Sequence, residues 1–354
     1  MWATWRVGTL CAMSSLTLPA GLSDAFELST ASSDEIAEVY GLVVDETVAV
    51  LGHCHNTVED IRAWLEPPDG AESRQILVRR KTGELSQWWE GIRGPGSTRV
   101  LVLVHTHPDV SQRDGDALTR AAWQLMLPWV EEISGTDRTD EVLVHSGCLI
   151  GDDAAFQRLL DAGFRHERTF WEMIGPVADQ PEADAVADGL IIKPATDHAL
   201  VHRLIQEGFA GHWGFEPTGF EDWLAGEKGA AGYDPALWLL AEMDAEPAAA
   251  MLLSRRAAAD NGLYVQEIAT LREYRRRGIA SALLRSAFDV AREQGYDHVA
   301  LHVDSDNADG APGVYQRAGM QVRDGFHAFL RRLPSPAAPR DALAHGKAHT
   351  QHLI

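Results

Sequence analysis

Two segments of the chain repeat the same order of secondary-structure signals, and this repeat constrains the fold more than any other feature. In the first segment, an apolar run at 99–107 predicts a strand, and apolar residues at helical spacing predict a helix over 117–132. In the second, the run at 262–271 predicts a strand, residues 272–280 a loop, and residues 281–295 a helix. The repeated unit is therefore an α/β element.

Glycines fix the offset between the copies, because Gly115 and Gly278 are 163 residues apart and Gly163 and Gly319 are 156 residues apart. Only two copies exist and each is as large as a domain, so the pattern excludes a solenoid. A length of 354 residues agrees with about two domains. The predicted organisation is a disordered leader at 1–24, a first domain at 25–172, a linker at 173–188, a second domain at 189–333 and a disordered tail at 334–354.

The chain is strongly acidic, with 31 Lys and Arg against 52 Asp and Glu and a formal net charge of −21. Such a surface repels phosphate backbones and anionic membranes, so we expect no nucleic-acid or membrane partner and a cationic amine as ligand. Three cysteines without CxxC spacing argue against disulfides and a structural zinc site. We expect a cytoplasmic protein. The sequence leaves open its oligomeric state and whether translation starts at Met1 or Met13.

A run of arginines at 275–277 stands out against this acidic background, between the strand and the helix of the second copy. Gly278 lets the backbone approach a ligand closely and adopt a conformation that other residues avoid. The N–H groups that open the following helix then point at an anion, assisted by the helix dipole. The pattern favours a pyrophosphate cradle, although a solvated basic helix start has the same composition.

The motif Arg275-x-x-Gly278-x-Ala280 after a strand resembles the acyl-CoA loop of the GNAT acetyltransferase superfamily. Downstream, Asn307 and Tyr315 stand where that family carries an Asn and a helical Tyr four residues before a glycine. The approach to the loop departs from the family pattern, because Glu273 replaces a proline. The resemblance covers about residues 189–333 well and 25–172 more weakly, and it is to the tandem-domain actinobacterial type, similar to mycothiol synthase.

The resemblance implies two tandem GNAT-like α/β (α+β) domains, each a mixed twisted sheet flanked by helices. It implies an N-acetyltransferase that uses acetyl-CoA as cosubstrate and no metal, in which a primary amine of a small molecule attacks the thioester directly. Tyr315 takes the position of the general acid. The residues implied to bind acetyl-CoA are Leu271, Arg275, Arg276, Arg277, Gly278, Ile279, Ala280, Ser281 and Asn307.

The sequence does not single out one residue as the general base. Related tandem enzymes place a Glu where this chain has Tyr264. Glu267 on the same predicted strand is our candidate base, with His302 and Asp304 on the next strand as alternatives. Aromatic residues between 209 and 238 form either an acceptor pocket or core.

The first copy formally meets the loop pattern at Gln112-x-x-Gly115-x-Ala117, but Asp114 and Asp116 flank its glycine. Carboxylates at that point repel a pyrophosphate. Leu159 stands in place of the catalytic tyrosine and has no proton to donate. We therefore predict that the first domain is catalytically silent.

Three alternatives remain open. His105-Thr106-His107-Pro108 resembles the start of a zinc metalloprotease motif, but its spacing to Ser111 and Asp114 is too tight. Acetylation of a cysteinyl pseudo-disaccharide, as in mycothiol synthase, is weakened by Tyr264. A non-catalytic acyl-CoA-binding protein is suggested by the same substitution.

Overall fold

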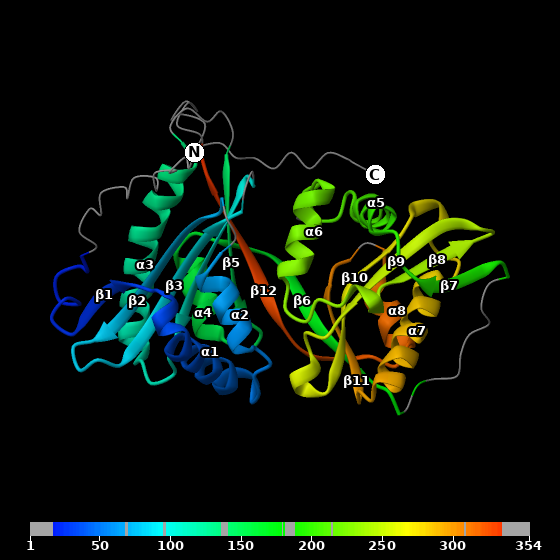
Figure 1. Ribbon diagram of the computed structural model, residues 1–354. Helices are drawn as coiled ribbons and strands as arrows, with labels where there is room; N and C mark the ends of the chain where they lie inside the picture. Colours follow the sequence, from blue (N-terminus) through cyan, green and yellow to red (C-terminus); the bar gives the residue numbers. More distant parts are fainter. Residues whose placement is uncertain are drawn as a thin grey trace, which may run out of the picture.

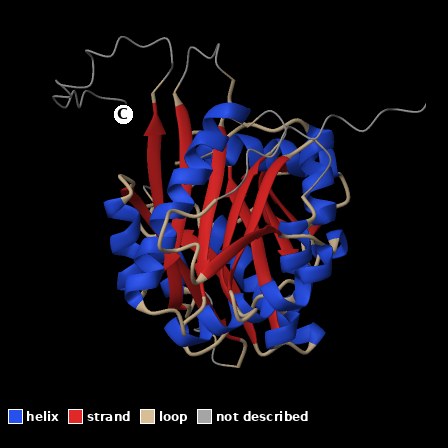
Figure 2. Ribbon diagram, turned by 90° about the vertical axis from the view of Figure 1, so that its left-hand side faces the viewer, coloured by secondary structure: helices blue, strands red, loops and turns tan. Residues whose placement is uncertain are grey.

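The computed structural model describes residues 17–67, 70–94, 97–135, 141–178, 180, 188–213, 215–307 and 309–334. Within these residues twelve strands form one continuous sheet in the order β1-β2-β3-β4-β5-β12-β6-β11-β10-β9-β8-β7. Helices cover both faces of this sheet (Figures 1 and 2). The two repeats predicted from the sequence form the two halves of the sheet.

The amino-terminal half consists of a strand, two helices, three strands, and then a helix, a strand, a helix and a last strand. Its elements are β1 (Phe26–Thr30), α1 (Ile36–Leu51), α2 (Val58–Leu65), β2 (Glu72–Arg80), β3 (Leu85–Arg93), β4 (Arg99–Thr106), α3 (Gln112–Ile133), β5 (Val142–Leu149), α4 (Asp153–Asp161) and β6 (Arg165–Pro176), with a short 3-10 helix at Ser33–Glu35.

The carboxyl-terminal half repeats that order. Its elements are β7 (Leu190–Pro194), α5 (His198–Phe209), α6 (Phe220–Gly229), β8 (Leu239–Met243), β9 (Glu246–Ser254), β10 (Gly262–Thr270), α7 (Ile279–Gln294), β11 (His298–Asp304), α8 (Ala311–Arg317) and β12 (Gln321–Leu333), with 3-10 turns at Pro235–Leu237, Ala258–Asp260 and Arg272–Tyr274.

Both faces of each half are buried. On β3 the adjacent residues Trp88 and Trp89 are each 0% exposed, although successive strand side chains point to opposite faces. Trp88 packs with the α1–α2 layer and Trp89 with the α3–α4 layer. In the other half, α7 and α8 cover one face and α5 and α6 the other.

The halves exchange their last strands. β12 lies between β5 and β6, and β6 lies between β12 and β11, all in antiparallel pairs. Figure 1 shows β12, in orange-red, running between the two halves beside green β6. Phe329 of β12 is buried in the amino-terminal core, and Met173 of β6 in the carboxyl-terminal core. The prediction of two tandem α/β units is confirmed, but each unit is completed by the other.

In each half the two parallel strands pair only at their beginnings. β4 pairs with β5 over residues 99–101, and β10 pairs with β11 over residues 262–265. Beyond these positions the strands continue without pairing to one another. Each half therefore has a wedge at the carboxyl ends of its parallel pair, where the two strands do not hydrogen-bond to one another.

Two described segments extend past the domain limits predicted from the sequence. β6 continues to Pro176, inside the predicted linker at 173–188, because its last residues pair with β11. Leu18, inside the predicted leader, is buried against the first core. Residues 1–16, half of the predicted linker (179 and 181–187) and residues 335–354 lie outside the described residues.

Every helix in the described part of the chain is too short or too polar to span a bilayer.

The strand exchange predicts that a cavity in β12 destabilises the half that is distant in sequence. Phe329→Ala removes a side chain that is 0% exposed, and we expect unfolding free energy to fall by about 3–5 kcal/mol. Val322→Ala on the same strand is the control, because Val322 is 44% exposed. Urea unfolding followed by the fluorescence of the tryptophans measures both. Equal effects of the two substitutions would contradict the core position of Phe329.

Candidate active site

A one-residue bulge in β10 decides which way Glu267 points. The register against β9 shifts between Val265 and Glu267. Leu263 and Val265 pack in the α7 core before the bulge, and Ile268 packs there after it. Because strand side chains alternate, the extra residue moves Glu267 to the opposite face, toward α5 and α6.

The segment after β10 forms an open loop at the start of α7. Arg276 and Gly278 both adopt left-handed backbone conformations, with φ of 62° and 78°. A side chain at position 278 would meet nothing within 4 Å, so the glycine borders open space. No side chain caps α7. The N–H groups of its first turn are therefore free to hold an anion.

A left-handed non-glycine residue costs about 1–3 kcal/mol and persists only where its surroundings fix it. Here Arg275 provides the support. Its guanidinium donates to the Thr270 carbonyl oxygen at 3.1 Å, to the Gly208 carbonyl oxygen at 2.8 Å and to Asp309 Oδ2 at 2.7 Å. These bonds tie the ends of β10 and α5 and the turn before α8 around the wedge.

The turn between β11 and α8 is held by Asn307. Its Oδ1 accepts from the N–H groups of Asp309 at 3.0 Å and Ala311 at 3.4 Å. The side-chain N–H₂ of Asn307 has no partner among the described residues. α8 then carries Tyr315, which is buried in the α7 core and whose hydroxyl has no hydrogen-bond partner in the described chain. Burial raises the pKa of the Tyr315 phenol, so it keeps its proton at neutral pH.

Residues 199–320, which contain the loop, the wedge and Tyr315, match the family model described as "Acetyltransferase (GNAT) family". Over these residues the chain is therefore similar to the GNAT acetyltransferases. A search of curated proteins returned no match.

Solved structures extend the likeness to both halves of the chain. A GCN5-related N-acetyltransferase from Sphaerobacter thermophilus is 24% identical with a TM-score of 0.73, covering 89% of this chain and 97% of that one. A tandem GNAT protein from the clavulanic acid biosynthesis pathway is 13% identical with a TM-score of 0.64, covering 87% and 98%. These similarities show that the fold is a tandem GNAT fold. The GNAT assignment supports acyl transfer in general terms.

The predicted acyl-CoA-binding residues fall into two groups in the structure. Some expose their side chains on the loop, and others offer only backbone groups to it. Arg276, Arg277 and Gly278 are exposed along the loop. Leu271 and Ile279 bury their side chains in the two cores, so only their backbones face the loop. Arg275 also offers little beyond its backbone, because its side chain is engaged in the three bonds described above. Ala280 and Ser281 lie in the first turn of α7.

Glu267 lies in an apolar setting with a second carboxylate nearby. Burial, followed by the Glu227 carboxylate on α6, raises the pKa of Glu267 to about 8. The Trp223 indole opposes this rise, but neither its Nε1 nor Glu267 Oε2 makes a hydrogen bond within the described residues. Sequence reasoning missed Glu227, although it follows Trp223 by one helical turn and shares its face of α6.

The alternative bases differ in availability. His302 Nδ1 lies 2.7 Å from the Tyr264 hydroxyl, and burial lowers the pKa of this histidine to about 4. The same burial raises the pKa of Tyr264 to about 12. Asp304 is occupied, because it contacts Arg168 at 3.4 Å and accepts from the Asp306 N–H at 3.0 Å. Among these candidate bases, Glu267 is the one with a buried carboxylate oxygen, Oε2, that makes no hydrogen bond within the described residues.

The corresponding loop of the amino-terminal half is closed. We expected its helix over 117–132, but α3 already begins at Gln112, because the Ser111 hydroxyl caps it by accepting from the Asp114 N–H at 3.2 Å. Gly115 is consequently a helical residue with no left-handed turn. A Cβ on Gly115 would lie 2.6 Å from the Arg158 guanidinium, which itself binds Asp116 at 2.8 Å. An internal ion pair thus covers the position of an anion.

A cavity of about 660 Å³ opens beside this closed loop, between α1, α3 and α4. Its charged lining consists of Glu46, Asp116, Asp152, Asp153, Asp161, Arg120, Arg158 and His107. Carboxylates outnumber the arginines, so its electrostatics disfavour a pyrophosphate. Although the cavity is large, its acidic lining argues against it as the acyl-CoA site.

Most of the aromatic residues between 209 and 238 are core. Trp223 and Trp238 are buried beside α5, and Phe209, Phe220 and Tyr233 pack against them. Trp213 instead reaches the other half, where it contacts the rings of His145 and Phe170.

Proposed function

We propose that the chain is an acetyl-CoA-dependent N-acetyltransferase that acts on a primary amine of a small cationic molecule, using the GNAT domain. The observation that carries the proposal is the uncapped start of α7 behind left-handed Arg276 and Gly278, placed at the wedge between β10 and β11. The cradle holds the pyrophosphate of acetyl-CoA, and the thioester extends into the wedge. Backbone N–H groups of β10 that do not pair with β11 there polarise the carbonyl.

In this reaction Glu267 takes one proton from the amine nitrogen, and that nitrogen attacks the carbonyl carbon of the thioester. The new C–N bond forms as the C–S bond breaks. The departing thiolate takes the phenol proton of Tyr315, which is replaced from water. The nitrogen loses one proton and the sulfur gains one, so a neutral amine and a thioester give an amide and a thiol.

The acceptor class follows from charge. The chain is −21 overall, and the Glu227 carboxylate on α6 lies close to Glu267 on β10. Such a field concentrates cations and lowers the cost of bringing an ammonium group close to the base. Aminoglycosides, polyamines and aminosugars are the amines to test.

The anion cradle is tested by placing a carboxylate in it. Gly278→Glu blocks the backbone approach and repels the pyrophosphate, and we expect acetyl-CoA affinity to fall at least about 100-fold in calorimetric titration. Gly295→Glu is the matched control, because Gly295 ends the same helix with φ of 80° and also borders open space. Wild type binds one acetyl-CoA per chain, since the first loop is closed. Two sites, or unchanged affinity of the Gly278 variant, would refute the assignment.

The base is tested through pH. A carboxyl with a pKa of about 8 is protonated below that pH and cannot accept a proton, so kcat/KM rises as pH increases through about 8. Glu227→Gln removes a carboxylate that raises this pKa, and the rising limb moves to lower pH. Glu221→Gln, an exposed site on the same helix, leaves the limb in place. If the rising limb of the kcat/KM profile stays in place in Glu227→Gln but shifts with the pKa of the acceptor amine, Glu267 is excluded as the base.

The acid is tested by removing one oxygen. Tyr315→Phe keeps the buried ring and deletes the proton donor, so we expect kcat to fall at least about tenfold with acetyl-CoA affinity unchanged. Release of the CoA thiol, followed with a thiol reagent, measures the rate. A wild-type rate in this variant would mean that water protonates the thiolate.

A further inference from the structure

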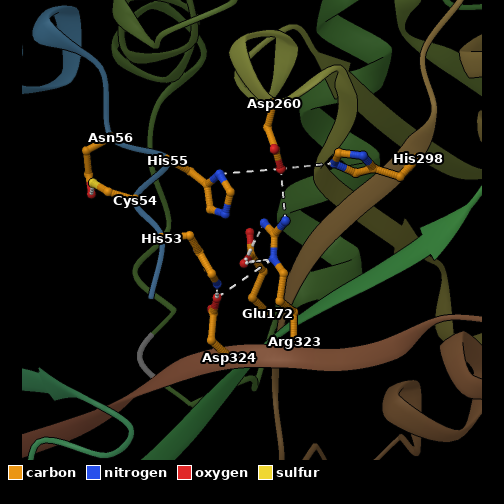
Figure 3. Close-up of polar contacts among 9 residues, drawn as sticks. All are labelled: His53, Cys54, His55, Asn56, Glu172, Asp260, His298, Arg323 and Asp324. Carbon is orange, nitrogen blue, oxygen red and sulfur yellow. Dashed lines mark hydrogen bonds and ion pairs between the residues drawn. The ribbon is translucent and has the colours of Figure 1, made fainter. Parts of the chain in front are cut away.

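A second group of polar side chains lies between the two halves, away from the acyl-CoA loop. His53 and His55 come from the connection between α1 and α2, whereas Arg323 and Asp324 come from β12. Figure 3 shows the two histidines pointing toward the β12 pair, with Asp260 and Glu172 completing the group. Its members come from five separate parts of the chain if His298 is included.

The ligand atoms of His53, His55 and Asp324 all lie within 4.8 Å of one another. His53 Nε2 is 3.2 Å from Asp324 Oδ2, already close to the spacing of roughly 3.4 Å that tetrahedral bonds of about 2.1 Å require. His55 completes the set after a small movement of its ring. Two imidazoles and one carboxylate are a common ligand set for zinc and similar divalent ions, with one position left for water.

Buried polar atoms of this group lack hydrogen-bond partners within the described residues, and His55 Nε2 and Asp324 Oδ2 among them could bind a metal. His55 Nδ1 lies 3.3 Å from Asp260 Oδ2, whereas its Nε2 is buried without any partner in the described chain. Metal-binding histidines typically have one ring nitrogen on a carboxylate and the other on the metal. Asp324 Oδ2 also makes no hydrogen bond within the described residues, despite the nearby His53.

Asp260 is well fixed for a supporting role. Besides His55, its Oδ2 contacts Arg323 Nη1 at 2.9 Å and His298 Nε2 at 3.5 Å. These contacts hold the carboxylate in place, so that it orients the His55 ring. A positioning residue of this kind typically changes metal affinity by about 10–100-fold.

The charge balance also favours a cation. The group contains three carboxylates, Glu172, Asp260 and Asp324, and one permanent cation, Arg323. Arg323 contacts Glu172 at 2.8 Å and Asp260 at 2.9 Å but Asp324 only at 3.7 Å. With neutral histidines the formal charge is −2, which one divalent ion cancels. Asp324 is the carboxylate left for it.

We propose that His53, His55 and Asp324 bind one divalent transition-metal ion of the zinc type, positioned by Asp260. The ion joins the connection between α1 and α2 to the exchanged strand β12 and so fastens the two halves together. The resemblance to the GNAT superfamily implied no metal, and the one His-x-His pair that we weighed from the sequence was His105 and His107. His53 and His55 gain their third ligand only through the fold.

The test is calorimetric titration of Zn²⁺ into the untagged, chelator-treated full chain, with Co²⁺ as a spectroscopic probe. We expect one high-affinity site per chain and a visible Co²⁺ spectrum of the tetrahedral type. His53→Ala, His55→Ala and Asp324→Asn each lower the affinity of that site at least about 100-fold, and Asp260→Asn lowers it about 10–100-fold. His107→Ala, in the other His-x-His pair, leaves it unchanged.

Circular dichroism confirms that each variant is folded, and the half-buried positions of His53 and His55 favour this. Zn²⁺ also raises the thermal midpoint of wild type but not of the His55→Ala variant. The proposal is overturned if the double variant His53→Ala/His55→Ala keeps the high-affinity site, if Asp324→Asn binds like wild type, or if His107→Ala loses the site equally.

Discussion

The antiparallel pairing of β6 with β12 joins the two halves of the sheet, and the rest of the molecule depends on it. Each of these strands completes the sheet of the half to which it does not belong in sequence. The exchange also places Glu172 of β6 between two neighbours in the sheet. It pairs with His302 of β11 on one side and with Asp324 of β12 on the other. The histidine group therefore combines side chains from strands of both halves.

The two halves differ in their loops because of small local differences on a common frame. Both have a wedge at their parallel strands, and both have a glycine near the start of the following helix. In the first half a serine cap draws Gly115 into the helix and an arginine covers it. In the second half Gly278 precedes the helix in a left-handed conformation and borders open space. A few polar contacts thus separate an open helix start from a closed one.

The sequence predicted the repeat, the α/β class and the loop, because these depend on local periodicity and on glycine and arginine at fixed spacing. It placed Glu267 on the correct strand but could not show its direction, because that depends on the bulge at residue 266. It read Arg275 as part of a ligand site, whereas its side chain is engaged with Gly208 and Asp309. It could not detect the strand exchange, since β12 has the same alternating pattern whichever half it joins. Long-range pairing, rather than composition, decides each of these points.

The position of β12 in the chain has a consequence for folding during synthesis. Leu149 of β5 pairs with Phe326, which leaves the ribosome 177 residues later. Until then β5 is an open sheet edge, and the first core lacks Phe329 and Leu333. The half that is made first is therefore the last to close, and pairings of such long sequence separation form slowly. During that interval the nascent chain exposes an apolar surface and a strand edge, which is the state that chaperones protect from aggregation.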